Sequence, residues 1–126
     1  MGDNPFILVV DDDAAIQSII EDTLAEGGFA SRLASSGEEA IGLLSTNKYR
    51  VMIIDISLGS DHVKGWPVAR RARAINPDLP VIYITGFDIP GGEQAASGPV
   101  LRKPVDPWRL IEVMEAEFAK IGERDC

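Results

Sequence analysis

The sequence predicts an α/β fold, in which a parallel sheet is covered by helices on both faces. Three short apolar runs, typical of strands buried on both faces, lie at Phe6–Val10, Val51–Ile54 and Pro80–Thr85. Segments with apolar residues at helical spacing separate these runs, and strands that alternate with helices form a parallel sheet through right-handed crossovers. The chain has 126 residues, enough for one domain and too few for two. We expect a single domain over residues 1–126, ordered over about 5–121.

The first half of the chain supplies two strands and two helices. Phe6–Val10 is followed by a helix that ends at Gly27–Gly28. The expected apolar face of this helix consists of Ile16, Ile19, Ile20 and Leu24. Ala30–Ala34 is short and more polar, which suits an edge strand. Ser36 and Glu39 then form a capping box that opens a second helix. Its apolar residues are Ala40, Ile41, Leu43 and Leu44.

The middle of the chain supplies the two remaining buried strands. Val51–Ile54 is the third strand and Pro80–Thr85 is the fourth. The helix between them ends at Asn76–Pro77, and its apolar face consists of Val68, Ala72 and Ile75. Residues 86–99 are rich in glycine and proline, so any helix there, such as Glu93–Ala96, is short and weak.

The last part of the chain completes the sheet and fixes the order of its strands. Val100–Leu101 is a brief fifth strand, and Asp106 and Pro107 begin a final helix as its N-cap and first residue. The apolar face of that helix consists of Leu110, Ile111, Met114, Phe118 and Ile121. The most apolar strands should be central, which predicts a doubly wound (βα)5 three-layer sandwich with strand order 2-1-3-4-5. This order reverses between strands one and three, where open α/β sheets bind ligands.

Acidic residues follow the two strands that flank this reversal. Asp11 and Asp12 follow the first strand and Asp55 ends the third, so all three should converge. Three carboxylates in one crevice repel one another unless a cation joins them. Oxygen ligands without histidine or cysteine indicate Mg²⁺, with Mn²⁺ as an alternative.

Two further polar residues belong to the same edge of the predicted sheet. Thr85 ends the fourth strand and Lys103 follows the fifth. A carboxylate nucleophile, a divalent cation, a lysine and a hydroxyl are the components that phosphoryl transfer needs. In this interpretation Lys103 and the cation neutralise phosphoryl oxygens, and Thr85 donates a hydrogen bond.

The segments VVDDD, IIDIS, YITG and LRKP occur in this order, each at the predicted end of a strand. With these segments the chain, from Phe6 to about Ile121, resembles the receiver domain of bacterial response regulators in two-component and phosphorelay signalling. The resemblance implies a flavodoxin-like fold. It also implies that Asp55 accepts a phosphoryl group from the phosphohistidine of a histidine kinase or a histidine phosphotransfer protein.

The resemblance also implies roles for the other matching residues. Asp11, Asp12 and Asp55 would hold Mg²⁺ together with the main-chain carbonyl of Ser57. Lys103 would pair with the phosphoryl group, and the Lys103–Pro104 peptide bond would be cis, as X–Pro bonds readily are. Thr85 would be the switch hydroxyl that moves toward the phosphoryl group. By contrast, we expect Asp13 to cap the following helix or face solvent.

Three features depart from the family's usual pattern. The loop ISLGSDHVKGW after Asp55 lacks the common Met–Pro pair, and Gly65 lies two positions late. Val100 replaces the aromatic residue that usually rotates with the switch threonine. The weak helix in residues 86–99 occupies part of the usual output face, and we expect it to become ordered on phosphorylation or binding.

Composition excludes several other classes of protein. The net charge of −8 argues against nucleic acid as a partner, and Arg70, Arg71 and Arg73 are expected to form a solvated helix face. No apolar stretch is long enough to cross a membrane and no secretory signal is present, so we expect no membrane partner. The single cysteine, Cys126, allows no internal disulfide, which favours a cytoplasmic protein. We expect His62 to be solvated, and we expect packing to account for Trp66 and Trp108, which lie at helix starts.

These patterns leave three functions open. The leading one is a stand-alone receiver that docks to an unidentified protein or relays its phosphoryl group, as a monomer or a phosphorylation-dependent dimer. We base the stand-alone form on the chain ending soon after the last helix. The second is a receiver-like binding module that works without phosphorylation. The third is a phosphatase of the haloacid dehalogenase type, because Asp11-Asp12-Asp13 contains Asp-x-Asp. That family needs a further acidic pair after its lysine, where this chain turns helical at Pro107.

Overall fold

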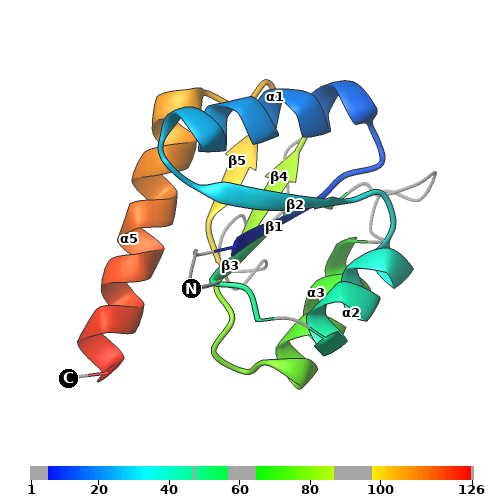
Figure 1. The fold of residues 1–126 in the computed structure, drawn as a ribbon, viewed down its shortest axis with the longest axis vertical. Helices are drawn as coiled ribbons and strands as arrows, with labels where there is room; N and C mark the ends of the chain where they lie inside the picture. Colours follow the sequence, from blue (N-terminus) through cyan, green and yellow to red (C-terminus); the bar gives the residue numbers. More distant parts are fainter. Residues whose placement is uncertain (1–5, 47, 57–64, 87–97, 126) are drawn as a thin grey trace.

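The computed structural model describes residues 6–46, 48–56, 65–86 and 98–125. Within them the chain forms a parallel five-stranded sheet of order β2-β1-β3-β4-β5, which confirms the predicted topology (Figure 1). The strands are β1 (Phe6–Val10), β2 (Ala30–Ala34), β3 (Val51–Asp55), β4 (Val81–Thr85) and β5 (Val100–Arg102). The helices are α1 (Ala14–Glu26), α2 (Gly37–Thr46), α3 (Gly65–Ile75) and α5 (Pro107–Asp125). The short helix expected at Glu93–Ala96 lies outside the described residues.

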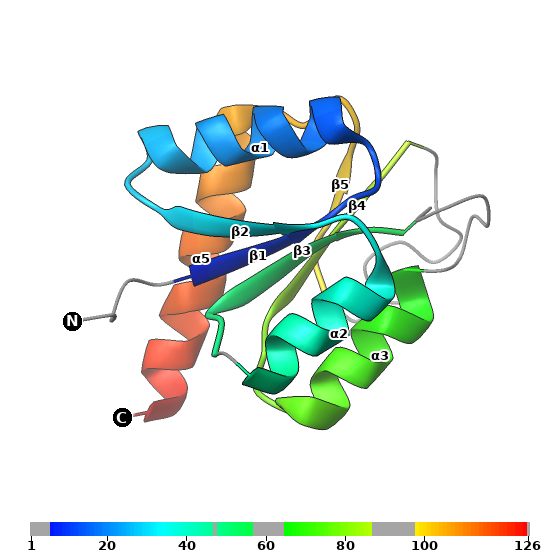
Figure 2. The ribbon, with the colours of Figure 1, turned by 45° about the vertical axis from the view of Figure 1, so that its right-hand side comes forward.

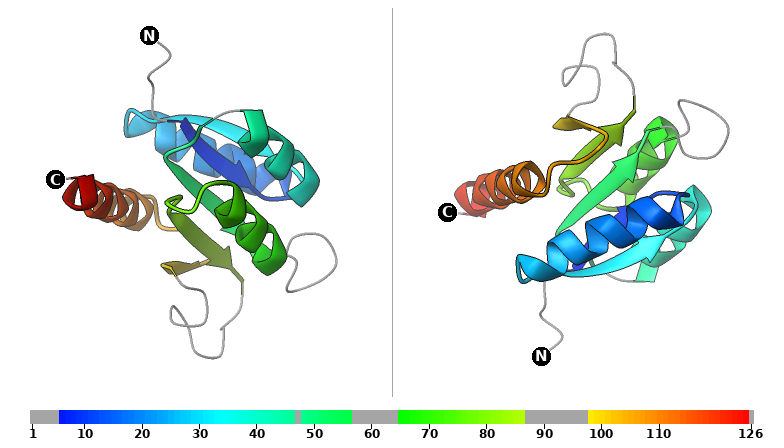
Figure 3. Two further views of the ribbon diagram at one scale, coloured as in Figure 1. Left: turned by 90° about the horizontal axis from the view of Figure 1, so that it is seen from below. Right: turned by 90° about the horizontal axis from the view of Figure 1, so that it is seen from above.

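Different helices cover the two faces of the sheet (Figures 2 and 3). On one face, α1 and α5 pack against alternate strand residues such as Ile7, Val9 and Ile53. On the other face, α2 and α3 pack against the intervening residues, among them Leu8 and Ile54. All residues of β3 and β4 are buried, as expected for strands covered on both sides. The three-layer arrangement therefore leaves the carboxyl ends of the central strands as the place for a site.

Three residues predicted to be packed are exposed instead: Ile19, Ile75 and Trp108, whose side chain at the start of α5 is 83% exposed. The side of α1 that faces the sheet carries Gln17, Ile20 and Leu24, so the neighbouring Ile19 turns outward and is 54% exposed. In α3 the small residue Ala72 contacts the core, whereas Ile75, the last residue of the helix, remains 43% exposed. Apolar spacing alone was wrong in α1 because the buried side also includes the polar Gln17, and in α3 because Ile75 lies at the exposed end of the helix.

Side-chain caps begin three of the helices where the sequence places them. Asp13 is the N-cap of α1, and one of its carboxylate oxygens accepts hydrogen bonds from two backbone amides in the first turn. Ser36 Oγ accepts from the amide of Glu39 at 3.1 Å, as a capping box requires. The Glu39 carboxylate reaches back to the amide of Ser35, one residue earlier than expected, at 2.7 Å. Asp106 caps α5 by accepting from the amide of Trp108.

The first residue of α2 approaches α3 closely, and this contact requires a glycine. A β-carbon added at Gly37 would lie 2.4 Å from Cγ2 of Val68. We expect Gly37→Ala to destabilise the fold by about 1–3 kcal/mol, because the branched valine cannot move aside within a packed interface. Urea unfolding measures this effect.

A matched control for this contact lies in the same helix. A β-carbon at Gly42 meets nothing within 4 Å, so Gly42→Ala should stabilise α2 by up to about 1 kcal/mol. Adding Val68→Ala to Gly37→Ala should recover part of the loss, so the two substitutions should not be additive. A Gly37→Ala protein as stable as the parent would contradict the close contact.

Candidate functional site

Three carboxylates meet at the carboxyl ends of β1 and β3, where the strand order reverses. Asp11 follows β1, Asp55 is the last residue of β3, and Asp12 lies beside Asp11. One oxygen from each residue lies within 4.8 Å of the others. Asp11 is 0% and Asp55 2% exposed, whereas Asp12 is exposed to solvent. The site is therefore a crevice with two buried carboxylates at its base and a third at its rim.

Backbone hydrogen bonds hold the Asp11 end of this crevice. The amide of Asp11 donates to the carbonyl of Ala34 at the end of β2, at 3.1 Å. The amide of Asp13 donates to Asp11 Oδ1 at 2.9 Å, which fixes the carboxylate as the chain turns into α1. Because Asp13 also caps α1, its side chain is committed to the helix. The expectation that Asp13 acts as a cap is confirmed.

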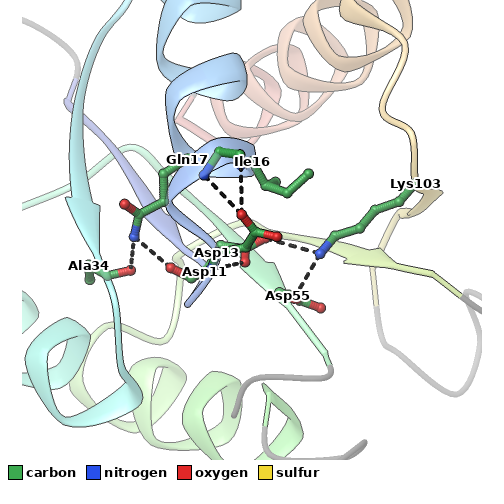
Figure 4. Close-up of polar contacts among 8 residues, drawn as sticks. Asp11, Asp13, Ile16, Gln17, Ala34, Asp55 and Lys103 are labelled. Carbon is green, nitrogen blue, oxygen red and sulfur yellow. Dashed lines mark hydrogen bonds and ion pairs between the residues drawn. The ribbon is translucent and has the colours of Figure 1, made fainter. Parts of the chain in front are cut away.

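Gln17 is a positioning residue that the sequence interpretation missed. It is largely buried in α1, and its side-chain amide donates to the carbonyls of Asp11 and Ala34 (Figure 4) and also to Ser35 Oγ. The amide therefore ties the end of β1 to the end of β2 beside the crevice. A polar residue in register with the buried Ile20 and Leu24 was the available signal, since a buried amide needs partners.

Lys103 reaches across from the end of β5 to both buried carboxylates (Figure 4). Its Nζ lies 2.9 Å from Asp55 Oδ2, which accepts a hydrogen bond, and 3.2 Å from Asp11 Oδ2. The backbone amide of Lys103 donates to the carbonyl of Thr85 at 2.7 Å, which links the ends of β4 and β5. The Lys103–Pro104 peptide bond is cis. These contacts direct the lysine into the crevice.

The surroundings shift the protonation equilibria of two groups in the crevice. Burial raises the pKa of the Asp11 carboxyl above its ordinary value, and the nearby Asp55 charge acts in the same direction. The amide of Asp13 and the ammonium of Lys103 oppose this shift without reversing it. Burial tends to lower the pKa of Lys103, but its hydrogen bond to Asp55 and the Asp11 charge raise that pKa overall. The lysine therefore stays protonated at neutral pH.

The crevice has the donor set of a site for a hard divalent cation. With all groups ionised, three carboxylates face one ammonium. Asp11 Oδ2 is buried and, among the described residues, has an ion pair with Lys103 but no hydrogen bond of good geometry. Such an oxygen can accept a further positive partner, and an all-oxygen donor set suits Mg²⁺, Mn²⁺ or Ca²⁺. The three aspartates therefore fit a metal ion.

The other residues that the sequence analysis singled out lie partly beside the crevice and partly elsewhere. Thr85 is fully buried at the end of β4, in the strand next to Asp55. Val100 pairs with Tyr83 across β4 and β5. Residues 57–64 of the altered loop, among them Ser57 and His62, lie outside the described residues. Of the basic residues, Arg70 and Arg71 are exposed, whereas Arg73 donates to the Tyr83 hydroxyl at 3.4 Å.

Removal of the Asp11 charge should stabilise the fold in buffer without divalent cations. Because the folded-state pKa of Asp11 lies above the unfolded value of 3.8, ionisation of this group favours unfolding. This destabilisation is absent below the unfolded pKa and grows as pH rises through the folded pKa. Asp11→Asn should therefore show a higher urea midpoint than the parent at pH 7, and the difference should shrink as pH falls toward 4. Equal midpoints at pH 7 would contradict a raised pKa of Asp11 in the folded state.

The fold and the crevice together define a class of protein: a doubly wound, flavodoxin-like α/β domain with an acidic site at its topological switch point. Residues 7–115 match the family described as the response regulator receiver domain. The chain therefore belongs to the response regulator receiver family of two-component signalling.

Similar proteins and solved structures agree with this membership. The chain is 31% identical over 114 residues to response regulator MprA of Mycobacterium sp. (strain KMS), covering 87% of this chain and 49% of that protein. It is 30% identical, with a TM-score of 0.81, to the receiver domain of the Francisella response regulator 1452, covering 94% and 99% of the two chains. A receiver protein from Sinorhizobium medicae WSM419 is 32% identical, with a TM-score of 0.79 and coverage of 91% and 94%.

Two further observations concern the length of the chain and the character of its helices. The chain spans about half the length of the curated relatives that it matches. Among the helices that the structure describes, none has both the length and the apolar character needed to cross a bilayer.

Proposed function

We propose that this domain accepts a phosphoryl group from the phosphohistidine of a histidine kinase or a histidine phosphotransfer protein onto Asp55. The observation that carries the proposal is the contact between buried Asp55 and Lys103, 2.9 Å apart, beside the carboxylates of Asp11 and Asp12. A lysine there can pair with an incoming phosphoryl oxygen, and the carboxylates can hold a cation next to it.

In the proposed reaction Asp55 is the nucleophile. One of its carboxylate oxygens attacks the phosphorus, a P–O bond forms and the P–N bond to histidine breaks. The electron pair stays on the imidazole nitrogen of the donor. Lys103 pairs with the transferred group, and the Thr85 hydroxyl donates a hydrogen bond to it. Asp11, Asp12, Asp55 and the Ser57 carbonyl would hold Mg²⁺, and the bound ion would neutralise phosphoryl oxygens.

The phosphorylated domain would then act through other proteins. It would dock to a downstream target or pass the phosphoryl group to a histidine of another protein, and it would not turn over a small-molecule substrate. We place this activity in the cytoplasm, where the histidine kinase domains that serve receivers are found. A monomer or a phosphorylation-dependent dimer would be compatible with this role.

Phosphotransfer profiling against a panel of purified histidine kinases tests the proposal and identifies the donor. Each autophosphorylated kinase is mixed with the protein and Mg²⁺, and transfer is followed at short times. We expect fast transfer from one kinase or a few, and no transfer when Mg²⁺ is chelated. If no kinase and no small phosphodonor such as phosphoramidate labels the protein, it works instead as a phosphorylation-independent binding module.

The rim carboxylate provides a test of the metal site alone. Asp12→Asn should weaken Mg²⁺ binding by about tenfold or more, because a neutral amide replaces one of the anionic groups around the cation. Calorimetric titration measures this affinity. Asp22→Asn removes an exposed carboxylate from α1 and should leave the affinity unchanged. Equal Mg²⁺ affinities in all three proteins would contradict the assignment of Asp12.

A further inference from the structure

A pocket lies between the C-terminal ends of α2 and α3, which run side by side on the face of the sheet opposite α1 and α5 (Figure 2). It has a volume of about 490 Å³. Leu44, which is 6% exposed, and Ile75, which is 43% exposed, contribute apolar side chains to it. The residues that line it are Leu44, Ser45, Thr46, Lys48, Ile75 and Asn76. We call it the α2–α3 pocket.

Hydrogen bonds within the chain hold the walls of this pocket. Ser45 Oγ donates to a backbone carbonyl one turn earlier in α2, at 2.9 Å, and Thr46 Oγ1 does the same at 3.4 Å. On the other wall, Asn76 Oδ1 accepts from the backbone amide of Asp78 at 3.2 Å. These polar groups therefore serve the protein itself. The exposed ammonium of Lys48 supplies a positive charge beside the pocket.

The helix beside the pocket carries further positive charges along its exposed side. Arg70 and Arg71 are exposed, and α3 contains no acidic residue. Arg71 lies one helical turn before Ile75, so it extends from the side of α3 that borders the pocket. No ion pair joins Lys48, Arg70 or Arg71 to a carboxylate of a described residue. The acidic residues of α2 lie in its first turn, at the other end of that helix.

Helix geometry and charge together select what can occupy the pocket. The C-terminal ends of α2 and α3 carry partial negative charges, which disfavour a carboxylate inside it. The cations of Lys48 and Arg71 favour carboxylates just outside it. Asp78, the acidic residue that follows α3, lines a separate pocket together with Arg73. An apolar side chain flanked by acidic residues therefore matches both the pocket and its surroundings.

Other classes of occupant match this surface less well. Three exposed cations are too few to hold nucleic acid or an anionic membrane against a net charge of −8. A two-fold contact between two copies of the chain would bring the basic side of α3 against itself, which like charges disfavour. An acidic segment of a different protein meets neither obstacle.

We propose that the α2–α3 pocket binds an acidic segment of another protein through one large apolar side chain. That anchor, a leucine, isoleucine or phenylalanine, packs against Leu44 and Ile75. Aspartates or glutamates on both sides of the anchor pair with Lys48, Arg70 and Arg71. The proposal makes no use of the acidic crevice or of a metal ion, so it goes beyond the phosphoacceptor function.

Fluorescently labelled peptides test this proposal. The probe carries one leucine with glutamates on both sides in a glycine–serine background, and two controls replace either the glutamates by lysines or the leucine by serine. Anisotropy titrations use the full, unphosphorylated chain in buffer with chelator, so their outcome does not depend on phosphorylation. We expect saturable binding of the leucine–glutamate probe only, weakened by added salt. Absence of saturable binding, or equal binding of either control peptide, would overturn the proposal.

Protein variants locate the binding surface. Arg71→Glu should raise the dissociation constant of the probe about tenfold, because a repulsive charge replaces an attractive one. The same variant should bind the lysine peptide more tightly than the parent does. Ile75→Ser should raise the constant about fivefold, because the anchor loses part of its apolar contact.

Matched controls make the same substitutions on the opposite face of the sheet. Arg109→Glu on α5 changes the net charge as Arg71→Glu does, and Ile19→Ser on α1 removes another exposed apolar side chain. Both should leave the dissociation constant within about twofold of the parent value. Undiminished binding to Arg71→Glu would refute the proposal, as would an equal loss in Arg109→Glu. Self-association of the free chain that Arg71→Glu abolishes would also refute it, because the occupant would then be a second copy.

Discussion

Asp55→Asn is expected to abolish phosphorylation of the domain. In the parent protein, incubation with Mg²⁺ and phosphoramidate should add the mass of one phosphoryl group to the intact chain. The asparagine amide is a very poor nucleophile, and it also removes a negative charge from the metal site. The substituted protein should therefore show no mass increase. Intact-protein mass spectrometry at acidic pH measures the result, since a phosphoryl aspartate must be kept from hydrolysing.

Two controls make this experiment specific. Asp22→Asn removes a carboxylate on the exposed side of α1 and should be phosphorylated like the parent. Circular dichroism should show Asp55→Asn to be folded, because the amide oxygen can still accept the hydrogen bond of Lys103. A mass increase that persists in Asp55→Asn, or that maps to Asp11 or Asp12 in the parent, would contradict the assignment of the phosphoacceptor.

Lys103→Met should produce the largest change in stability among the site variants. The ammonium lies between two buried carboxylates, and its own side chain is only 21% exposed. Its removal leaves Asp11 and Asp55 facing each other without a cation. We expect a loss of about 3 kcal/mol in the free energy of unfolding without divalent ions, at the low end for breaking a buried pair. Urea unfolding in chelator measures it.

Mg²⁺ should reverse much of this loss, which separates an electrostatic effect from a packing defect. Because the lysine no longer competes for the carboxylates, Lys103→Met should bind Mg²⁺ more tightly than the parent, and bound ion stabilises the folded state by mass action. Phosphorylation should nevertheless be slower, since no ammonium pairs with the phosphoryl group. Arg109→Met, which removes an exposed pair with Glu112, should change stability by less than about 1 kcal/mol. Equal stability of Lys103→Met and the parent would contradict the claim that Lys103 offsets the repulsion between Asp11 and Asp55.

The topology was predictable because its signals are local and independent. Strands such as β3 are apolar without interruption from Val51 to Ile54, which is typical of strands covered on both faces. The carboxyl ends of parallel strands share one edge, so residues far apart in sequence, such as Asp11 and Asp55, could be placed together before any coordinates were known. Caps at Asp13 and Ser36 followed from side-chain chemistry.

Details that depend on tertiary contacts were not predictable. Ile19 fits a helical apolar stripe as well as Ile20 does, and only the position of the sheet decides which is buried. Gln17 was overlooked because a polar residue in a helix is usually solvated. Here its side-chain amide donates hydrogen bonds to backbone carbonyls at the ends of two strands. The distance of Lys103 from each carboxylate depends on how β5 meets β4, which the sequence does not encode locally.

A crystal structure with Mg²⁺ and beryllofluoride tests the central claim most directly. Beryllofluoride forms a complex with carboxylates that mimics an acyl phosphate. We predict beryllium bonded to a carboxylate oxygen of Asp55, with Lys103 in contact with a fluorine. We also predict the metal ion between Asp11, Asp12 and Asp55. Beryllofluoride bound at another residue, or a metal ion away from these three aspartates, would contradict the account.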